Sequence, residues 1–540
     1  MLKDRRLIPK WRPVGQTLET PEASNLANPS ANLDSGKIEQ LQRDIADWRK
    51  HGGIGFLGAV LAHSVHPAFN AEILAIAREA LAANSAITRI QRDAISTMLG
   101  VADQAPALIG QSAFSELNLS PQKLAVRQLR AVLRENNDNP MAWLDLAQFQ
   151  SAAGKEHAAE RSIQAALQLA PQNRTVLRTA ARFFVHIGQE GRGHRLISSH
   201  PRTASDPWLM ASEIALADLA QRESKFLKLG SRIVEDGKQF APMHMTELSG
   251  AVAVQQLKDG RVKKARKSQM MALRKPNDNV IAQAIFQKTE FGVALDGPGL
   301  DLAIQNSNEA LLLQHWSTGE ANGAEVQARL WYEQEPFSSR PVQLLALLNI
   351  YKADYAAAQA WLKLGLKSDP NADELIINMA YLKVRIGKLD EAQQLLIKAR
   401  RLSKKNEPFS KATEGFICYV QKHFAHGDLL YKEAMEEFSK ASNLEMMAYC
   451  GLFMALHAAE YDHPQANEHI ALANDLIKKY PSADTNIFLR LRNADSLVAP
   501  VDIIESDVRN LQQLVYDERA NILTIMRGVQ RRNAPKLIKK

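Results

Sequence analysis

The amino-acid sequence predicts an all-α protein, a right-handed α-solenoid of stacked helix pairs, and three observations carry this prediction. Ala324, Ala358 and Ala392 stand 34 residues apart, and a fixed period of that length indicates helix pairs that bury an apolar face only by stacking on their neighbours. Hydrophobic residues make up 46% of the 540 residues and aromatic residues 6%, which suits a helical protein. No alternating strand pattern bounded by turn residues stands out.

Two further sets of residues keep the period of these alanines. Apolar residues recur four positions after each alanine, at Ala328, Leu362 and Leu396. Residues four apart lie on one face of a helix, so this is the buried face of the second helix in each pair. Small residues recur five positions before each alanine, at Gly319, Ala353 and Gly387. They suit a tight turn between the two helices of a pair.

A second run with the same period lies upstream, at Ala125, Ala159 and Gly193. Its middle unit has the most complete pattern, which consists of Trp143, Leu146, Ala147, Gly154, Ala159, Ile163, Ala166 and Pro171. This pattern resembles the tetratricopeptide repeat (TPR), in which a large residue, a leucine and a small residue mark the first helix. Alanines and a proline mark its second helix. Gln150 stands where that repeat usually has an aromatic residue.

The sequence around the two arrays predicts further segments. Residues 13–36 are polar and contain prolines, a helical pattern begins after Ser35, and Asp296–Gly299 is the clearest break. The predicted organisation is a flexible basic and polar N-terminal tail over 1–36, helical layers over 37–119, a TPR-like array over 120–205, an irregular helical bridge over 206–300, a second TPR-like array over 301–480, C-terminal capping helices over 481–530 and a basic tail over 531–540. The apolar residues of 501–529 recur at alternating spacings of 4 and 3, which favours a capping helix, with a dimerising coiled coil as the alternative.

Charge and cysteine content limit the classes of function. The net charge is +8, but residues 1–12 carry +4 and residues 519–540 carry +7, so the body over 13–518 is close to neutral and is not a general polyanion binder. Cys418 and Cys450 lie in apolar helical stretches and are expected to be buried, reduced thiols. Met1–Gln16 lacks the apolar core of a secretory signal, and Ile54–Ala62 is too short to span a bilayer. We therefore expect a soluble cytoplasmic protein without membrane insertion.

The residues that could carry chemistry are few. The densest potential metal cluster straddles Pro464 and comprises His457, Glu460, Asp462, His463, Glu468 and His469. Because polar residues are expected in a turn between helices, a solvated turn is the favoured interpretation. Neither the paired-histidine motif of zinc peptidases nor a CxxC pair occurs, and no GxSxG elbow is present. The sequence thus predicts no enzymatic activity, no metal and no cofactor.

The resemblance to the TPR implies that first helices line a concave groove that accepts a peptide or a partner's helix. On that geometry the inward positions are Arg178, Arg182, Gln343, Leu347, Tyr351, Ile377, Tyr381 and Arg385. The downstream groove would be apolar and aromatic with a cationic edge, which suits an apolar helix or an extended peptide that carries an acidic residue. The alternative is that these side chains contact the next repeat instead.

The leading hypothesis is a non-enzymatic scaffold or adaptor that binds a protein through this groove, as a subunit or regulator of a larger complex. The second hypothesis is association with nucleic acid through a basic face and the C-terminal tail. The residues that would contact the polyanion are Arg261, Lys263, Lys264, Arg266, Lys267, Arg531 and Arg532. A simply solvated face is the alternative for the first five.

Overall fold

The computed structural model describes residues 7–11, 35–51, 57, 60, 70–83, 120–135, 137–240, 242–291, 304, 307–404 and 406–492. All regular secondary structure in these ranges is helical, which confirms the predicted all-α fold. None of the helices in this part of the chain is long and apolar enough to cross a membrane. The predicted break at 296–299, the 501–529 segment with its possible dimer contact, and Arg531 and Arg532 lie outside the described residues.

The described part of the chain contains a series of helices. They are α1 (Ser35–His51), α3 (Asn70–Ala83), α5 (Ser120–Glu135), α6 (Pro140–Ala152), α7 (Glu156–Leu169), α8 (Arg174–His186), α9 (Glu190–Ser198), η5 (Pro201–Ala204), α10 (Pro207–Leu219), α11 (Leu227–Asp236), α12 (Pro242–Lys258), α13 (Val262–Ala272), α14 (Asp278–Phe291), α16 (Asn308–Thr318), α17 (Ala321–Gln334), α18 (Ser339–Tyr351), α19 (Tyr355–Ser368), α20 (Asp373–Arg385), α21 (Leu389–Leu402), α22 (Glu407–Val420), α23 (Phe424–Lys440), α24 (Leu444–Glu460), α25 (Ala466–Lys479) and α26 (Ala483–Arg492).

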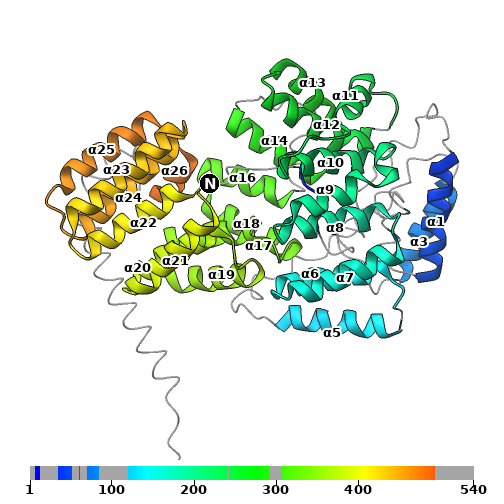
Figure 1. Ribbon diagram of the computed structural model, residues 1–540, viewed down its shortest axis with the longest axis horizontal. Helices are drawn as coiled ribbons and strands as arrows, with labels where there is room; N and C mark the ends of the chain where they lie inside the picture. Colours follow the sequence, from blue (N-terminus) through cyan, green and yellow to red (C-terminus); the bar gives the residue numbers. More distant parts are fainter. Residues whose placement is uncertain are drawn as a thin grey trace, which may run out of the picture.

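Consecutive helices pack as pairs, and each pair packs against the next. The most extensive contacts join α6 to α7, α12 to α13, and each first helix from α16 to α24 to the helix that follows it. Figure 1 shows these pairs as successive layers of a curved solenoid, which confirms the predicted stacking of helix pairs. Between the two arrays, α10 packs on both α9 and α12, and α12 also pairs with α13.

The 34-residue period marks a buried small residue on the second helix of each pair. Ala159, Ala324, Ala358 and Ala392 are each fully buried on a second helix. The turn that precedes them is left-handed, with φ of +70° at Gly154, +73° at Gly319, 59° at Ala353 and +76° at Gly387. This conformation ends one helix and redirects the chain within a few residues, and it favours glycine. The small residues predicted for these turns therefore serve that purpose.

The two arrays contact each other directly, although about 200 residues of chain separate the contacting helices. The turn after α6 meets the end of α19, and Gly154 lies so close that an added Cβ would stand 2.2 Å from the carbonyl oxygen of Lys367. Phe337, in the turn between α17 and α18, packs into the same apolar cluster as α6 and α8. At the far end, α26 packs on α16, α18 and α24. The solenoid thus curls far enough for distant pairs to touch.

The segment Leu7–Trp11 corrects one prediction. The flexible tail predicted over 1–36 does not hold for these five residues, because Leu7 is 2% exposed and Trp11 1% exposed. The segment has no helical or strand structure and lies among the green helices as a short dark-blue trace in Figure 1. Alternate residues, Leu7, Pro9 and Trp11, are buried, as expected of an extended chain on a surface.

Candidate functional site

The inner side chains of the downstream array converge on one another instead of facing an open groove. The hydroxyl groups of Tyr351 on α18 and Tyr449 on α24 are 2.7 Å apart. Trp316 on α16 donates its indole N–H to Asp484 on α26 over 2.9 Å. These contacts hold the first helices of the array close together. Instead of the expected open concave surface, the first helices over 301–480 therefore enclose a narrow interior.

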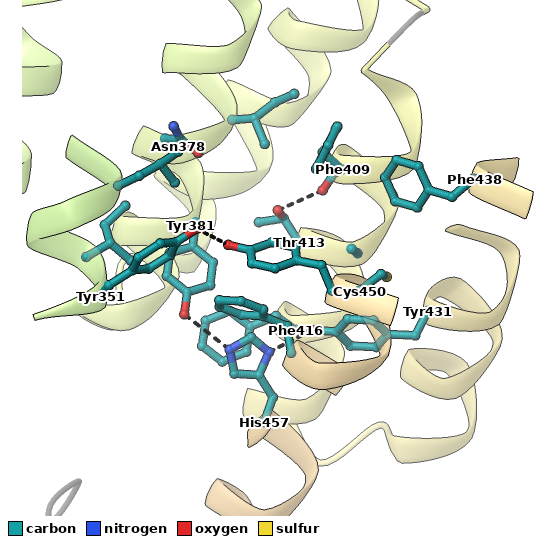
Figure 2. Close-up of a pocket in the computed structure, with 16 residues that line it drawn as sticks. Tyr351, Asn378, Tyr381, Phe409, Thr413, Phe416, Tyr431, Phe438, Cys450 and His457 are labelled. Atoms are coloured by element: carbon teal, nitrogen blue, oxygen red, sulfur yellow. Dashed lines mark hydrogen bonds between the residues drawn. The ribbon is translucent and has the colours of Figure 1, made fainter. Parts of the chain in front are cut away.

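A pocket of about 100 Å³ lies in this interior. Four of the predicted groove residues line it, namely Leu347, Tyr351, Ile377 and Tyr381. The structure adds residues from α22, α23 and α24, chiefly Phe409, Ala412, Thr413, Phe416, Tyr431, Cys450, Phe453 and His457, most of which Figure 2 labels. Among these, only Cys450 and His457 stood out in the sequence, and for other reasons, because α22 and α23 depart from the spacing of the preceding units.

His457 is the central polar group of the pocket wall, and its ring is held on every side. It is 1% exposed and stacks on Phe416 with ring centroids 3.7 Å apart. Its Nε2 lies 3.3 Å from the Tyr381 hydroxyl and its Nδ1 lies 2.7 Å from the Tyr431 hydroxyl. Burial, together with the charge of Arg385, lowers the pKa of His457 well below its usual value. The ring is therefore neutral and structural at physiological pH.

Arg385 fixes this network and corrects the predicted cationic edge. Its Nε and Nη2 donate to the Tyr381 hydroxyl over 3.0 and 2.9 Å, which leaves the Tyr381 proton for His457. Its Nη1 pairs with Glu460 on α24, whose side chain is 8% exposed. Since this carboxylate neutralises the guanidinium, Arg385 offers no charge to a partner. The separation of 75 residues between the two hid this pair from the sequence.

The two upstream arginines predicted to face the groove lie away from the pocket. Arg178 pairs with Glu247 on α12 and stands over the Trp208 ring at 4.9 Å. Arg182 stands over the Phe337 ring at 4.9 Å, and burial lowers the pKa of its guanidinium. Gln343 is half-buried on α18 outside the pocket lining. The structure thus brings together four of the eight predicted groove residues.

Asn378 brings an unused amide donor to the pocket wall. Its Nδ2 is buried and has no hydrogen-bond partner among the described residues. A buried amide N–H without an acceptor destabilises a protein by about 1–3 kcal/mol. Figure 2 shows Asn378 and His457 at opposite ends of the view, with the aromatic side chains between them. An acceptor that enters near Asn378 would satisfy this donor.

The two cysteines are buried and free, as predicted. Cys450 lines the pocket, and burial raises the pKa of its thiol to about 12. Burial also raises the pKa of Cys418. A thiol with such a pKa stays protonated at neutral pH and is a poor nucleophile.

The histidines near Pro464 correct the interpretation of a solvated turn. His463 and His469 are each 6% exposed, and their Nε2 atoms lie 3.2 and 3.1 Å from Asp428 on α23. Tyr419 also donates to Asp428. The backbone N–H of Gln465 donates to His463 Nδ1 over 2.9 Å, so the ring proton stands on Nε2. Asp428 is thus a buried carboxylate with the two imidazole rings and the Tyr419 hydroxyl close to it.

The basic face of α13 is partly paired. Arg261 forms an ion pair with Asp259, and Lys264 lies 3.5 Å from Glu235. Lys263, Arg266 and Lys267 are exposed on the outer side of the helix. Ala265 and Ala272 are buried on the other side of this helix.

Comparisons with known proteins give limited information. No protein-family model and no curated protein matches this sequence. Among solved structures, the human IFIT1 dimer with PPP-AAAA is similar at a TM-score of 0.35 and 12% identity, over 71% of this chain and 96% of that chain. The yeast Tom70 structure is similar at a TM-score of 0.31 and 12% identity, over 88% of this chain and 97% of that chain. Likeness at this level carries no argument about function.

Proposed function

We propose that the protein is a non-enzymatic helical-repeat scaffold of the cytoplasm, a subunit or regulator of a larger complex. It binds a protein partner by taking one apolar side chain into the pocket between α18, α20, α22 and α24. The observation that supports this function most is the combination, in one pocket, of an aromatic lining with the unsatisfied Asn378 donor.

The size of the pocket limits the ligand to a single side chain. An apolar cavity of about 150 Å³ binds benzene, so a pocket of about 100 Å³ accepts one aliphatic side chain such as that of leucine. Within the described part of the chain, no cation lines the pocket. Arg385, which contacts the lining residue Tyr381, pairs with Glu460, and Lys411, next to Ala412, pairs with Glu433 and Glu437. An uncharged anchor residue therefore fits this pocket better than an acidic one.

The Asn378 amide favours an extended peptide over a helix as the partner. Carbonyl groups within a helix already accept hydrogen bonds from their own helix. An extended segment presents free carbonyl groups beside its side chains. One such carbonyl would accept from Asn378 Nδ2 while the anchor side chain fills the pocket. Burial of one leucine side chain contributes about 1.5–3 kcal/mol, which makes it a small hot spot within a larger interface.

Two substitutions test the pocket. Ala412→Phe fills it from the half-buried rim, and Asn378→Leu removes the donor with little change in volume. Ile397→Ala on α21, where Ile397 is 50% exposed and remote from the pocket lining, is the matched control. Partners are recovered by affinity purification and mass spectrometry, and the binding of each is then measured with purified components.

We expect Ala412→Phe to weaken a direct partner at least tenfold and the control to leave it unchanged. Crosslinks from that partner should fall on residues 409–413, and alanine substitution of one apolar residue in its crosslinked segment should weaken binding equally. Far-UV circular dichroism checks that each variant keeps its helices. Full retention of every direct partner by both pocket variants would refute the proposal.

A second candidate function is association with nucleic acid, supported by the exposed Lys263, Arg266 and Lys267. Each phosphate contact that is lost should lower the slope of log affinity against log salt by about 0.7–0.9. Charge reversal of the three residues should then reduce that slope by about 2–3 in a titration with a labelled oligonucleotide. An unchanged slope, or an absence of binding by the original protein, excludes this candidate.

A further inference from the structure

The segment Leu7–Trp11 lies on the inner helices of the upstream half of the solenoid, apart from the pocket described above. It contacts α12 and α14 at one end and α6 and α8 at the other. Four extended residues beyond the first span about 13 Å, enough to cross several first helices. Within the described residues, the hydrogen bonds to its backbone come from side chains of those helices.

Leu7 occupies a space that exists because Gly250 has no side chain. A Cβ added at Gly250, in the middle of α12, would stand 2.7 Å from Leu7 Cδ1. Val280 and Ala272 complete the apolar wall. Glycine inside a helix destabilises it by about 1 kcal/mol relative to alanine. The close approach of Leu7 offers a physical reason for glycine here.

Two amide side chains hydrogen-bond to the backbone of the segment. Asn279 Nδ2 donates to the carbonyl oxygen of Ile8 over 3.1 Å. Gln148 Nε2 donates to the carbonyl oxygen of Trp11 over 2.7 Å. Both amides lie on inner helices and are at most 3% exposed. This is how a groove recognises the backbone of an extended peptide without forming a sheet.

Lys10 meets two carboxylates that belong to different helices. Its Nζ lies 2.9 Å from Asp278 on α14 and 3.4 Å from Glu309 on α16. The Glu309 side chain is 1% exposed and also pairs with Arg340 over 2.9 Å. Lys10 thus bridges carboxylates of two helices. This part of the groove is therefore complementary to a basic side chain.

Trp11 fills an aromatic pocket where the two arrays meet. Its ring lies 5.9 Å from Phe183 on α8, edge to face, and 4.6 Å from Phe337. Its Nε1 is buried and has no hydrogen-bond partner among the described residues. The indole is thus held by apolar contact alone.

We infer that this inner face is a second peptide-binding site, specific for an extended segment with an aliphatic residue, a lysine three positions later and a tryptophan after it. Its occupant is Leu7–Trp11 of the same chain, bound as a tethered ligand that leaves and rebinds. Leu7, Lys10 and Trp11 each have separate contacts, and side chains of the described residues donate hydrogen bonds to the backbone. The tether supplies a local concentration on the order of millimolar.

A synthetic peptide of residues 5–13 with a fluorescent label tests this inference by anisotropy. The protein is compared with a variant that lacks residues 1–11. For a peptide with a Kd of about 10 µM, a tethered competitor at about 1 mM weakens apparent binding roughly 100-fold. We therefore expect clear binding to the shortened protein and about 100-fold weaker binding to the original one. Equal affinity for both, or none for the shortened and folded protein, overturns the inference.

Substitutions on both sides define the site. Gly250→Ala should weaken the peptide, because its methyl carbon would stand 2.7 Å from Leu7 Cδ1 and the leucine side chain must shift. Asp278→Lys should weaken it similarly, and a peptide with Lys10→Glu should regain part of the loss with that variant. Lys263→Ala, on the exposed face of α13, is the control and should leave affinity unchanged.

A second design covers the case in which the shortened protein fails to fold. A protease site inserted after residue 22 of the full chain is cut once the protein has folded. Dilution followed by size-exclusion chromatography should then release the fragment, and the labelled peptide should replace it. If the fragment stays bound for days at nanomolar protein concentration, the segment is a permanent part of the core, and the inference is overturned.

Discussion

Two turn glycines test the contact between the arrays, because they share a backbone conformation and differ in their neighbours. Gly154 has φ +70° and Gly387 has φ +76°. A Cβ at Gly387 would meet nothing within 4 Å, whereas a Cβ at Gly154 would stand 2.2 Å from the Lys367 carbonyl oxygen. Alanine at Gly387 therefore measures the conformational cost alone. Alanine at Gly154 adds the collision with α19.

The structure gives the size of both effects. A left-handed alanine costs about 1 kcal/mol or slightly more relative to glycine. Ordinary contact requires about 3.4 Å, so alanine at Gly154 must move the end of α6 from α19 by about 1 Å. A packed contact does not survive such a gap without loss of its dispersion energy. We therefore expect Gly154→Ala to cost at least 2 kcal/mol more than Gly387→Ala, which carries the conformational cost alone.

Hydrogen exchange with mass spectrometry locates each effect. Gly387→Ala should accelerate exchange about fivefold in α20 and α21 only, since 1 kcal/mol corresponds to about that factor. Gly154→Ala should accelerate exchange more strongly in α6 and α7 and also in α19, which is remote in sequence. Unchanged exchange in α19 would show that the arrays do not meet at Lys367, and the reasoning about solenoid closure would be wrong.

Three further predictions concern buried polar groups. Burial and the Arg182 charge lower the pKa of His186 to about 3, so on acidification the unfolded chain takes up this proton at a higher pH than the folded one. The free energy of unfolding should therefore fall as pH drops from about 6.5 towards 3, by up to about 1.4 kcal/mol per pH unit. His186→Asn should flatten that part of the pH profile measured by urea unfolding, and an identical profile contradicts the assignment. The raised pKa of Cys450 predicts that native protein at pH 8 stays unreactive towards a thiol reagent until urea unfolds it, and rapid native labelling would contradict this. Arg385→Met leaves Glu460 buried without its partner and should lower the free energy of unfolding by about 3–5 kcal/mol. In urea titrations, the double variant with Glu460→Met should recover most of this loss. If it does not, the broken ion pair is not the cause of the loss.

The parts of the fold that the sequence predicted are those that local spacing controls. Ala324, Ala358 and Ala392 reveal the helix pairs because each unit needs a small residue at its own helix crossing. Gly319 and Gly387 reveal the turns because only a left-handed residue ends one helix and starts the next so quickly. Both signals lie within one repeat and require no knowledge of distant chain.

Contacts between distant residues were the ones missed. The pairing of Arg385 with Glu460 joins α20 to α24, and no local pattern relates the two. Asp428 is 41 residues away from His469 in the sequence, so its contact with the histidines could not be foreseen and a solvated turn was predicted instead. The downstream pocket was found in part, because four of its residues are inward positions of regular repeats. The remainder depends on how tightly the array curls, which small differences in packing at every repeat determine together.

The order of synthesis gives the Leu7–Trp11 segment a further significance. Lys10 precedes its partner Asp278 by 268 residues. A ribosome that adds about 5–20 residues per second needs roughly 15–50 s to make that stretch. During this interval the leucine and tryptophan have no groove to enter, and nascent-chain factors can reach them. The segment is thus translated long before it can be buried, and its protection coincides with completion of the helices that surround it.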